Sequence, residues 1–178
     1  FAGTPTRRIK GKFDELQKIR KFRESIPDWM DEMGEKELKA NWDRELAALN
    51  QQASVVLRVN TLKTTKVKLQ DLLRNEQIET VGLPKKQDAL QLVERKNVFV
   101  TQAFKDGLFE VQDGSSQLVA PFLEVKHCQK VIDTCAVAGG KNLHLASMME
   151  NKGQIIAMDI YQHKLSELKK RDKRDGAN

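Results

Sequence analysis

The chain has few of the residues that build metal centres and disulfide frameworks. It contains two cysteines and three histidines in 178 residues, and His127, His144 and His163 lie far apart in the sequence. No spacing typical of metal ligands results, so we expect no metal. Two distant cysteines, Cys128 and Cys135, indicate reduced thiols. No apolar run is long enough to span a membrane and no signal-peptide pattern opens the chain, so we expect a cytoplasmic protein.

Positive charge, in contrast, is in excess. The formal net charge of +6 and the sequence pI near 9.3 favour a polyanionic partner, although a modest basic excess is also common on surfaces that bind nothing. The basic residues gather in four runs, at residues 7–12, 18–23, 61–68 and 169–174. The last run alternates with Leu165 and Leu168 at helical spacing, which predicts a solvated helix face.

The most informative segment is residues 131–159, VIDTCAVAGGKNLHLASMMENKGQIIAMD. An apolar strand, a turn through Gly139 and Gly140, a helix and a second apolar strand ending on an acid form the first half of a Rossmann-type crossover. A phosphate-binding P-loop is excluded, because Cys135 stands where that motif needs glycine and Asn142 where it needs serine or threonine. The dinucleotide pattern GxGxxG also fails.

A turn of this kind suits a ligand that carries both a carboxylate and an adenosine. Lys141 would lie near the carboxylate and Asp159, at the end of the second strand, near the ribose. S-adenosylmethionine has both groups.

Three motifs carry a resemblance to one family. The run DTCAVAGGKNLHLA, residues 133–146, resembles the cofactor motif of RNA 5-methylcytosine methyltransferases. The run GLFEVQDGSSQLVAPFL, residues 107–123, is similar to the family's preceding motif, and VLRVNTLKT, residues 56–64, to the Arg-x-Asn strand of its small RNA-binding subdomain. Three motifs in the family's order argue against chance. Within the family, the bacterial enzymes that act on 16S ribosomal RNA are the nearest in pattern.

The resemblance implies an S-adenosylmethionine-dependent RNA (cytosine-C5) methyltransferase that acts on ribosomal RNA. It implies that Asp133 steadies the turn. The implied cofactor-binding residues are Cys135, Ala136, Val137, Ala138, Gly139, Gly140, Lys141 and Asp159. The implied RNA-binding residues are Arg58, Asn60, Lys63, Lys66 and Lys68.

The sequence departs from the family at three places. Val137 stands where a small residue is usual, and Asn142 replaces the usual threonine at the helix start. The family's catalytic Asp-Ala-Pro-Cys and Thr-Cys-Ser runs have no match before Asn178. This chemistry needs a cysteine thiolate that adds to cytosine C6; Cys135 is expected at the end of a buried strand and Cys128 in a loop, so neither is predicted as the nucleophile. We therefore expect a piece of a longer protein, inactive alone, as the first residue, Phe1, also suggests.

The predicted fold is α/β with three parts. Residues 1–50 are an N-terminal helical segment, residues 51–100 a small ferredoxin-like α/β RNA-binding subdomain, and residues 101–178 the first part of a Rossmann-type methyltransferase domain. Helical spacing indicates that the aromatic and methionine side chains of the first part pack in a core. The second part is expected to have strands at 55–60 and 89–93 around a helix capped near Thr64 or Thr65, and the third to begin with a helix over 113–124.

The two parallel strands of the third part would leave apolar side chains uncovered. The remainder of the domain or another chain is therefore needed to cover them.

Two other functions remain open from the sequence. One is a non-enzymatic RNA-binding module, in which Val137 and Asn142 have eroded the cofactor turn. The other is a Rossmann methyltransferase that acts on a small molecule. A Pro-Cys run about one strand and one helix after Asn178 would select the RNA enzyme.

Overall fold

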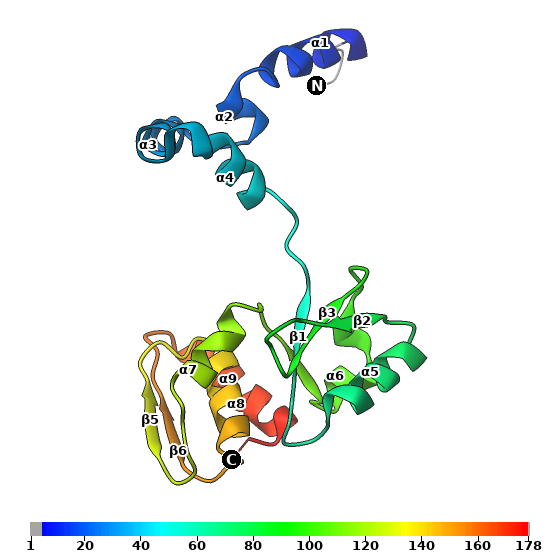
Figure 1. Ribbon diagram of the computed structural model, residues 1–178, viewed down its shortest axis with the longest axis vertical. Helices are drawn as coiled ribbons and strands as arrows, with labels where there is room; N and C mark the ends of the chain where they lie inside the picture. The colour runs from blue at the N-terminus through cyan, green and yellow to red at the C-terminus, as the bar shows by residue number, and fades with distance from the viewer. Residues whose placement is uncertain (1–4, 178) are drawn as a thin grey trace. The chain divides into compact units, whose positions relative to one another are not determined.

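The structure, a computed structural model, describes residues 5–177, which divide into two compact units joined near residue 53 (Figure 1). The first unit is helical, as predicted for residues 1–50. Its elements are α1 (Thr6–Leu16), α2 (Arg20–Arg23), α3 (Asp28–Leu38), the 3-10 helix η1 (Lys39–Asn41) and α4 (Trp42–Leu49). Pro27 occupies the N-cap position of α3, directly before the first helical residue, Asp28. No helix in the described part of the chain is long and apolar enough to cross a membrane.

The first unit packs around Trp42. The indole ring lies against Gly34, where an added Cβ would come within 2.3 Å of Trp42 Cε2, so a larger residue there would displace the ring. Trp42 Nε1 donates to Asp31 Oδ1 at 2.9 Å, and Arg20 Nε donates to the same oxygen at 2.6 Å. The prediction that the aromatic and methionine side chains of this unit pack in a core is wrong for four of them. Phe13, Phe22, Trp29 and Met33 are exposed.

The second unit begins with a four-stranded antiparallel sheet. Its strands are β1 (Val56–Val59), β2 (Thr80–Gly82), β3 (Ala89–Leu92) and β4 (Phe109–Val111), in the spatial order β2-β3-β1-β4. With α5 (Lys66–Asn75) between β1 and β2, and α6 (Gln102–Lys105) between β3 and β4, the order is β-α-β-β-α-β. The predicted ferredoxin-like subdomain is confirmed. The fourth strand of this sheet, β4, lies after the expected boundary at residue 100.

The two faces of this small sheet meet different partners. Side chains alternate along a strand, and on one face Leu57, Val59 and Phe109 pack with Leu69 and Leu73 of α5 in the main core. The other face carries Arg58 and Glu110, which are cross-strand neighbours in the β1–β4 ladder. Both are almost fully buried. This second face therefore has to be covered by the chain that follows β4.

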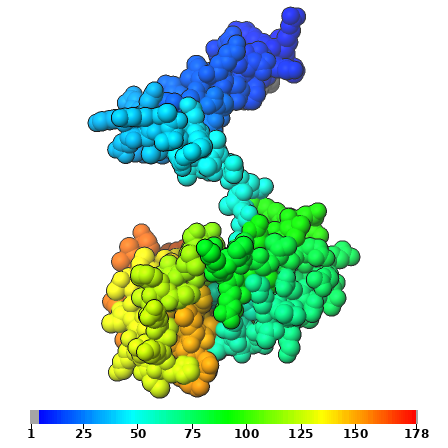
Figure 2. All heavy atoms as spheres, viewed as in Figure 1, coloured from blue at the N-terminus to red at the C-terminus, as the bar shows by residue number. Residues whose placement is uncertain are grey.

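The covering part is the fragment of a Rossmann-type domain. It consists of β5 (Lys130–Asp133), α8 (Gly140–Met148), β6 (Gln154–Ala157) and α9 (Gln162–Asp175), and β5 and β6 pair in parallel. This confirms the predicted crossover. In Figure 2 the atoms of the small sheet, in green, and those of the Rossmann part, in yellow to orange, form a continuous packed surface within the second unit.

The predicted lack of cover on β5 and β6 is confirmed. Ile132 and Ile156 on the strands and Met158 just after them are exposed. Residues 113–124, expected as one helix, instead form the 3-10 helix η3 (Ser116–Leu118) and the short α7 (Val119–Phe122). The start of this segment is capped by Asp113, whose Oδ1 accepts from the amides of Ser115 and Ser116 at 2.8 and 3.3 Å.

Candidate cofactor turn and its supporting contacts

The turn after β5 is held by backbone contacts to the neighbouring strand. Asp133 Oδ1 accepts from the Cys135 amide at 3.1 Å, and the Ala136 amide donates to the carbonyl of Met158 at 2.9 Å. Gly139 then adopts φ 83°, in the left-handed region, directly before α8. A Cβ at this position would come within 2.8 Å of the Leu168 side chain of α9. Glycine is therefore required both by the conformation and by the packing of the turn.

The N-terminus of α8 follows this turn with its first amides available. Leu143 makes the first intrahelical hydrogen bond, to Gly139 at 2.9 Å, and no side chain caps the helix. The preceding N–H groups, from Gly140 to Asn142, have no intrahelical acceptor because of the geometry of any helix start. Together with the helix dipole they form an electropositive site suited to an anionic group such as a carboxylate.

A hollow of about 290 Å³ lies beside the turn. Residues from the end of β4, from η3, from the turn and from α9 line it. They are Val111, Gln112, Asp113, Ser116, Asp133, Cys135, Ala136, Val137, Ala138, Gly140, Lys141 and Arg171. Six of the eight predicted cofactor residues thus share one hollow, and Gly139 lies between two of them in the chain. Cys135, expected at the end of a buried strand, is exposed instead, because β5 ends at Asp133 and lacks cover.

Asp159, the eighth residue, does not line this hollow. Its Oδ2 accepts from the Val137 amide at 2.9 Å and its Oδ1 from the Tyr161 amide at 2.9 Å. These two backbone hydrogen bonds, that from Tyr161 first, hold the pKa of Asp159 below its ordinary value. The carboxylate thus remains charged and ties the turn after β5 to the end of β6. Each of its oxygens retains a further lone pair for a ligand hydroxyl.

Val137 carries the strain of this turn. Its φ is 49°, a left-handed conformation that is unfavourable for a β-branched residue. Its amide hydrogen bond to Asp159 holds it there. The other substituted position, Asn142, is buried. In the described part of the chain, neither Nδ2 nor Oδ1 of its side chain has a hydrogen-bond partner.

The predicted contact of Arg58 and Asn60 with RNA is wrong for both side chains, because both are buried. Arg58 is 2% exposed and Asn60 3%. Arg58 Nη1 donates to Gln112 Oε1 at 2.6 Å and to the Gly140 carbonyl at 2.5 Å. Asn60 Nδ2 donates to the carbonyls of Gly107 and Asp175, at 2.7 and 2.8 Å. The Arg-x-Asn strand therefore binds the Rossmann part of the same chain.

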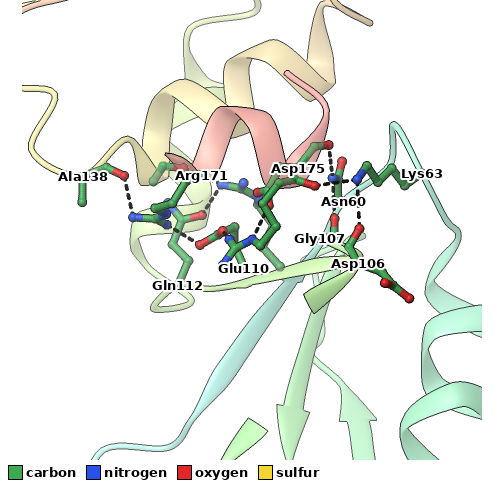
Figure 3. Close-up of polar contacts among 12 residues, drawn as sticks. Asn60, Lys63, Asp106, Gly107, Glu110, Gln112, Ala138, Arg171 and Asp175 are labelled. Carbon is green, nitrogen blue, oxygen red and sulfur yellow. Dashed lines mark hydrogen bonds and ion pairs between the residues drawn. The ribbon is translucent and has the colours of Figure 1, made fainter. Parts of the chain in front are cut away.

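The three predicted RNA-binding lysines have different surroundings. Lys63 Nζ donates to the carbonyls of Asp106 and Arg174, at 2.9 and 2.5 Å, so it satisfies the C-terminal end of α9 (Figure 3). Lys66 Nζ donates to the Gln87 carbonyl at 3.1 Å. Lys68 is exposed on the first turn of α5. Lys66 and Lys68 remain candidates for RNA contact.

Two further arginines contact the underside of the turn and the sheet. Arg171 Nη1 donates to the Ala138 carbonyl at 2.5 Å, and its Nη2 pairs with Glu110 (Figure 3). Arg174 also pairs with Glu110. The predicted solvated face of α9 is thus wrong for these arginines, although Lys169, Lys170 and Lys173 are exposed. The sequence signal that was missed is Glu110 itself, a carboxylate at an inward position of a short strand.

Comparison with known families agrees with this geometry. A profile described as "Methyltr_RsmF/B-like, ferredoxin-like domain" matches residues 26–99, and one described as "16S rRNA methyltransferase RsmB/F" matches residues 120–178. The chain belongs to the RsmB/F family of 16S rRNA methyltransferases. The family match extends from α3 into the small sheet and then covers the whole β5–α9 region.

Among curated relatives, the chain is 37% identical over 113 residues to a probable ribosomal RNA small subunit methyltransferase B of Bacillus subtilis, covering 64% of this chain and 25% of the relative. It is 35% identical over 147 residues to the protein of the same description from Synechocystis, covering 81% of this chain and 33% of the relative. The chain therefore spans a quarter to a third of the length of these relatives.

Solved structures share the fold. A methyltransferase homolog protein from Pyrococcus horikoshii superposes with a TM-score of 0.80 at 26% identity, over 89% of this chain and 52% of that chain. The structure of NSun6 from the same organism, solved with SFG, gives a TM-score of 0.80 at 19% identity over 85% of this chain and 63% of that chain, which is a likeness of fold alone.

Proposed function

We propose that the protein containing this chain transfers a methyl group from S-adenosylmethionine to C5 of cytosine in small-subunit ribosomal RNA. The observation that carries the proposal is the turn between β5 and α8: a left-handed Gly139, an uncapped helix start and a hollow that six of the predicted cofactor residues line. The family to which the chain belongs consists of rRNA methyltransferases, and its members use S-adenosylmethionine.

The residues present fit this cofactor. The carboxylate of its methionine part would be held by the first amides of α8 and by Lys141, where the helix start and the ammonium group both favour negative charge. Asp159 would accept from the ribose hydroxyls with the lone pairs that Val137 and Tyr161 leave available. When bound, S-adenosylmethionine supplies an electrophilic methyl group.

The ferredoxin-like subdomain and α1 would bind the RNA. Lys66 and Lys68 at the start of α5 present ammonium groups that can neutralise phosphates, and the basic helix α1 adds Arg7, Arg8, Lys10 and Lys12 in exposed positions. Arg58 and Asn60 would contribute indirectly, by holding the sheet against the Rossmann part.

The nucleophilic thiolate of the reaction would come from outside these 178 residues. Cys135 lines the hollow beside the turn, where the cofactor would lie, whereas the attacking thiolate has to lie against C6 of the target base. Cys128 is exposed and precedes β5. Neither cysteine is proposed as the nucleophile.

A methyl-transfer assay tests the function. The full-length protein, incubated with small-subunit ribosomal RNA and labelled S-adenosylmethionine, is expected to label the RNA at cytosine C5. The 178-residue chain alone is expected to transfer no methyl group, and Cys135→Ser in the full-length protein should retain the activity. Labelling by the chain alone would make Cys135 or Cys128 a candidate nucleophile, and loss of activity in Cys135→Ser at unchanged cofactor affinity would assign that role to Cys135. Absence of labelling by the full-length protein on any RNA would refute the proposed enzyme.

A further inference from the structure

Arg58 is a buried cation whose hydrogen bonds go to neutral groups. Its Nη1 donates to the amide oxygen of Gln112 and the carbonyl of Gly140, and within the described part of the chain no carboxylate forms an ion pair with it. Glu110, its cross-strand neighbour, pairs instead with Arg171 and Arg174. Burying a guanidinium without a paired carboxylate costs desolvation free energy. A role for the charge of Arg58 at this position would explain why it is buried there.

The position of Arg58 places its charge directly under the turn. The accepting carbonyl belongs to Gly140, the first residue of α8. The neighbouring carbonyl of Ala138 accepts from Arg171 at 2.5 Å. Two guanidinium groups, one from the sheet and one from α9, therefore bind two carbonyls of the same turn, two residues apart.

Hydrogen bonds at these carbonyls fix the orientation of the peptide groups that contain them. In a trans peptide group the C=O of one residue and the N–H of the next point in opposite directions. The hydrogen bond from Arg58 to the Gly140 carbonyl therefore orients the N–H of Lys141, an amide of the helix start beside the hollow that Gly140 and Lys141 line. The arginines also raise the electrostatic potential at a helix start that is already electropositive. Cations are unfavourable at a helix N-terminus unless an anion binds there.

We propose that Arg58, oriented by Gln112, is a positioning residue for the turn between β5 and α8: it fixes the turn's peptide groups from the small sheet and adds positive charge beneath the site of an anionic ligand. Arg171, held by Glu110, does the same from α9. The contact with the turn stands on the geometry alone, whereas its effect on S-adenosylmethionine rests on the proposed function.

The burial of Arg58 agrees with this role. Desolvation lowers the pKa of its guanidinium to about 10, so the group still carries its charge at neutral pH. His144, on α8, has its own pKa lowered by burial and then by the charge of Arg58. His144 is therefore neutral near pH 7 and does not compete with Arg58 for an anion.

Hydrogen exchange of the turn amides tests the contact directly. Arg58→Met in the full-length protein is expected to speed exchange at Ala136, Gly139 and Leu143, whose amides bond within the turn and its flanks, by about ten-fold or more, the loss expected for a hydrogen bond from a charged group. Exchange in α5, residues 66–75, should stay unchanged, since α5 packs on the opposite face of the small sheet from Arg58. Arg95→Met, at an exposed position, is the matched control and should change neither region.

The affinity for S-adenosylmethionine, measured by calorimetry, is expected to fall about ten-fold in Arg58→Met and to be unchanged in Arg95→Met. If Arg58→Met does not fold, Arg58→Lys replaces it in both measurements. A lysine keeps the charge but cannot reproduce the guanidinium geometry, so a smaller increase of exchange in the turn and a smaller loss of affinity are expected.

The outcomes separate the two proposals. Unchanged exchange in the turn, or an equal increase in the turn and in α5, would overturn the positioning role and leave Arg58 as an ordinary stabilising residue. If Arg58→Met speeds exchange in the turn only, and the wild-type protein binds no S-adenosylmethionine, the positioning role would be supported and the proposed cofactor refuted.

Discussion

Like Arg58, His144 is a polar side chain buried in the second unit. It is 6% exposed on α8, and its Nδ1 is buried with no hydrogen-bond partner among residues 5–177. Burial, and then the charge of Arg58, lower its pKa from 6.5 to about 4. A neutral imidazole is thus part of the folded state, and protonating it opposes folding.

This shift predicts a pH dependence of stability. Between about pH 6.5 and pH 4 the unfolded chain binds a proton at His144 that the folded chain does not, so the free energy of unfolding falls as the pH falls through this window. The full loss is roughly 3 kcal/mol at 1.36 kcal/mol per pKa unit. Urea titrations at a series of pH values, on the wild type and on His144→Gln, provide the measurement.

The comparison with His144→Gln isolates this one group. Burial raises the pKa of Asp88 and Asp172, which gives stability changes of the opposite sign, but these are present in both proteins and cancel in the difference. The difference in free energy of unfolding should be constant above about pH 7 and change by roughly 3 kcal/mol towards pH 4. A difference that is independent of pH would contradict the prediction.

At the level of single residues, the sequence predicted the residues of the turn but not Arg58, which holds the turn from the small sheet. Cofactor positions could be predicted because a glycine pair between an apolar strand and a helix is a local pattern. The role of Arg58 could not, because its partners Gln112 and Gly140 lie 54 and 82 positions away in the sequence. An arginine in an apolar strand was therefore interpreted as a surface residue, while the structure buries both faces of that strand.

At the scale of elements, α5 shows how a local signal fixes a helix start. Thr65 is its N-cap, with an extended backbone, and its Oγ1 accepts from the Lys68 amide at 3.4 Å. Thr64, the other candidate from the sequence, donates to the Thr65 carbonyl at 3.5 Å and satisfies no helix amide. The expected cap is therefore confirmed and assigned to Thr65.

Replacing each threonine tests this assignment. Thr65→Ala should lower the free energy of unfolding by about 1 kcal/mol, because a helix amide loses its acceptor. Thr64→Ala, one residue away, is the matched control and should change it by less than about 0.5 kcal/mol. Urea denaturation of both variants measures the values. Equal losses in the two variants would show that the Thr65 side chain does not cap α5.

Other elements could not be predicted because they are too short to carry a pattern. The strands β2 and β4 have three residues each, fewer than an alternating pattern needs. On α5, Leu69 and Leu73 are buried but Leu72 is 43% exposed, because the sheet covers a narrower stripe of the helix than the leucines occupy. Both differences follow from tertiary contacts that local spacing does not encode.

At the scale of the whole molecule, charge is divided between contacts within the chain and charges that face solvent. Arg58, Arg171 and Arg174 hold the second unit together, so they add to the net charge of +6 without being free for a polyanion. Exposed lysines remain on several helices of the same unit, among them α5 and α9. The composition alone could not separate these groups, because burial decides which charges can reach a phosphate.

The lysines of α5 and those of α9 should differ in their contribution to RNA binding. If Lys66 and Lys68, at the start of α5, contact phosphates, replacing both with glutamine should flatten the slope of log affinity against log salt by about 1.4, since each phosphate contributes about 0.7 for a single strand. Lys169→Gln with Lys173→Gln, a matched pair of exposed lysines on α9, should change the slope much less. Fluorescence anisotropy of a single-stranded oligoribonucleotide over a salt series gives both slopes. Equal flattening by the two pairs would mean that diffuse charge governs binding, and the assignment of an RNA-binding surface to α5 would then be wrong.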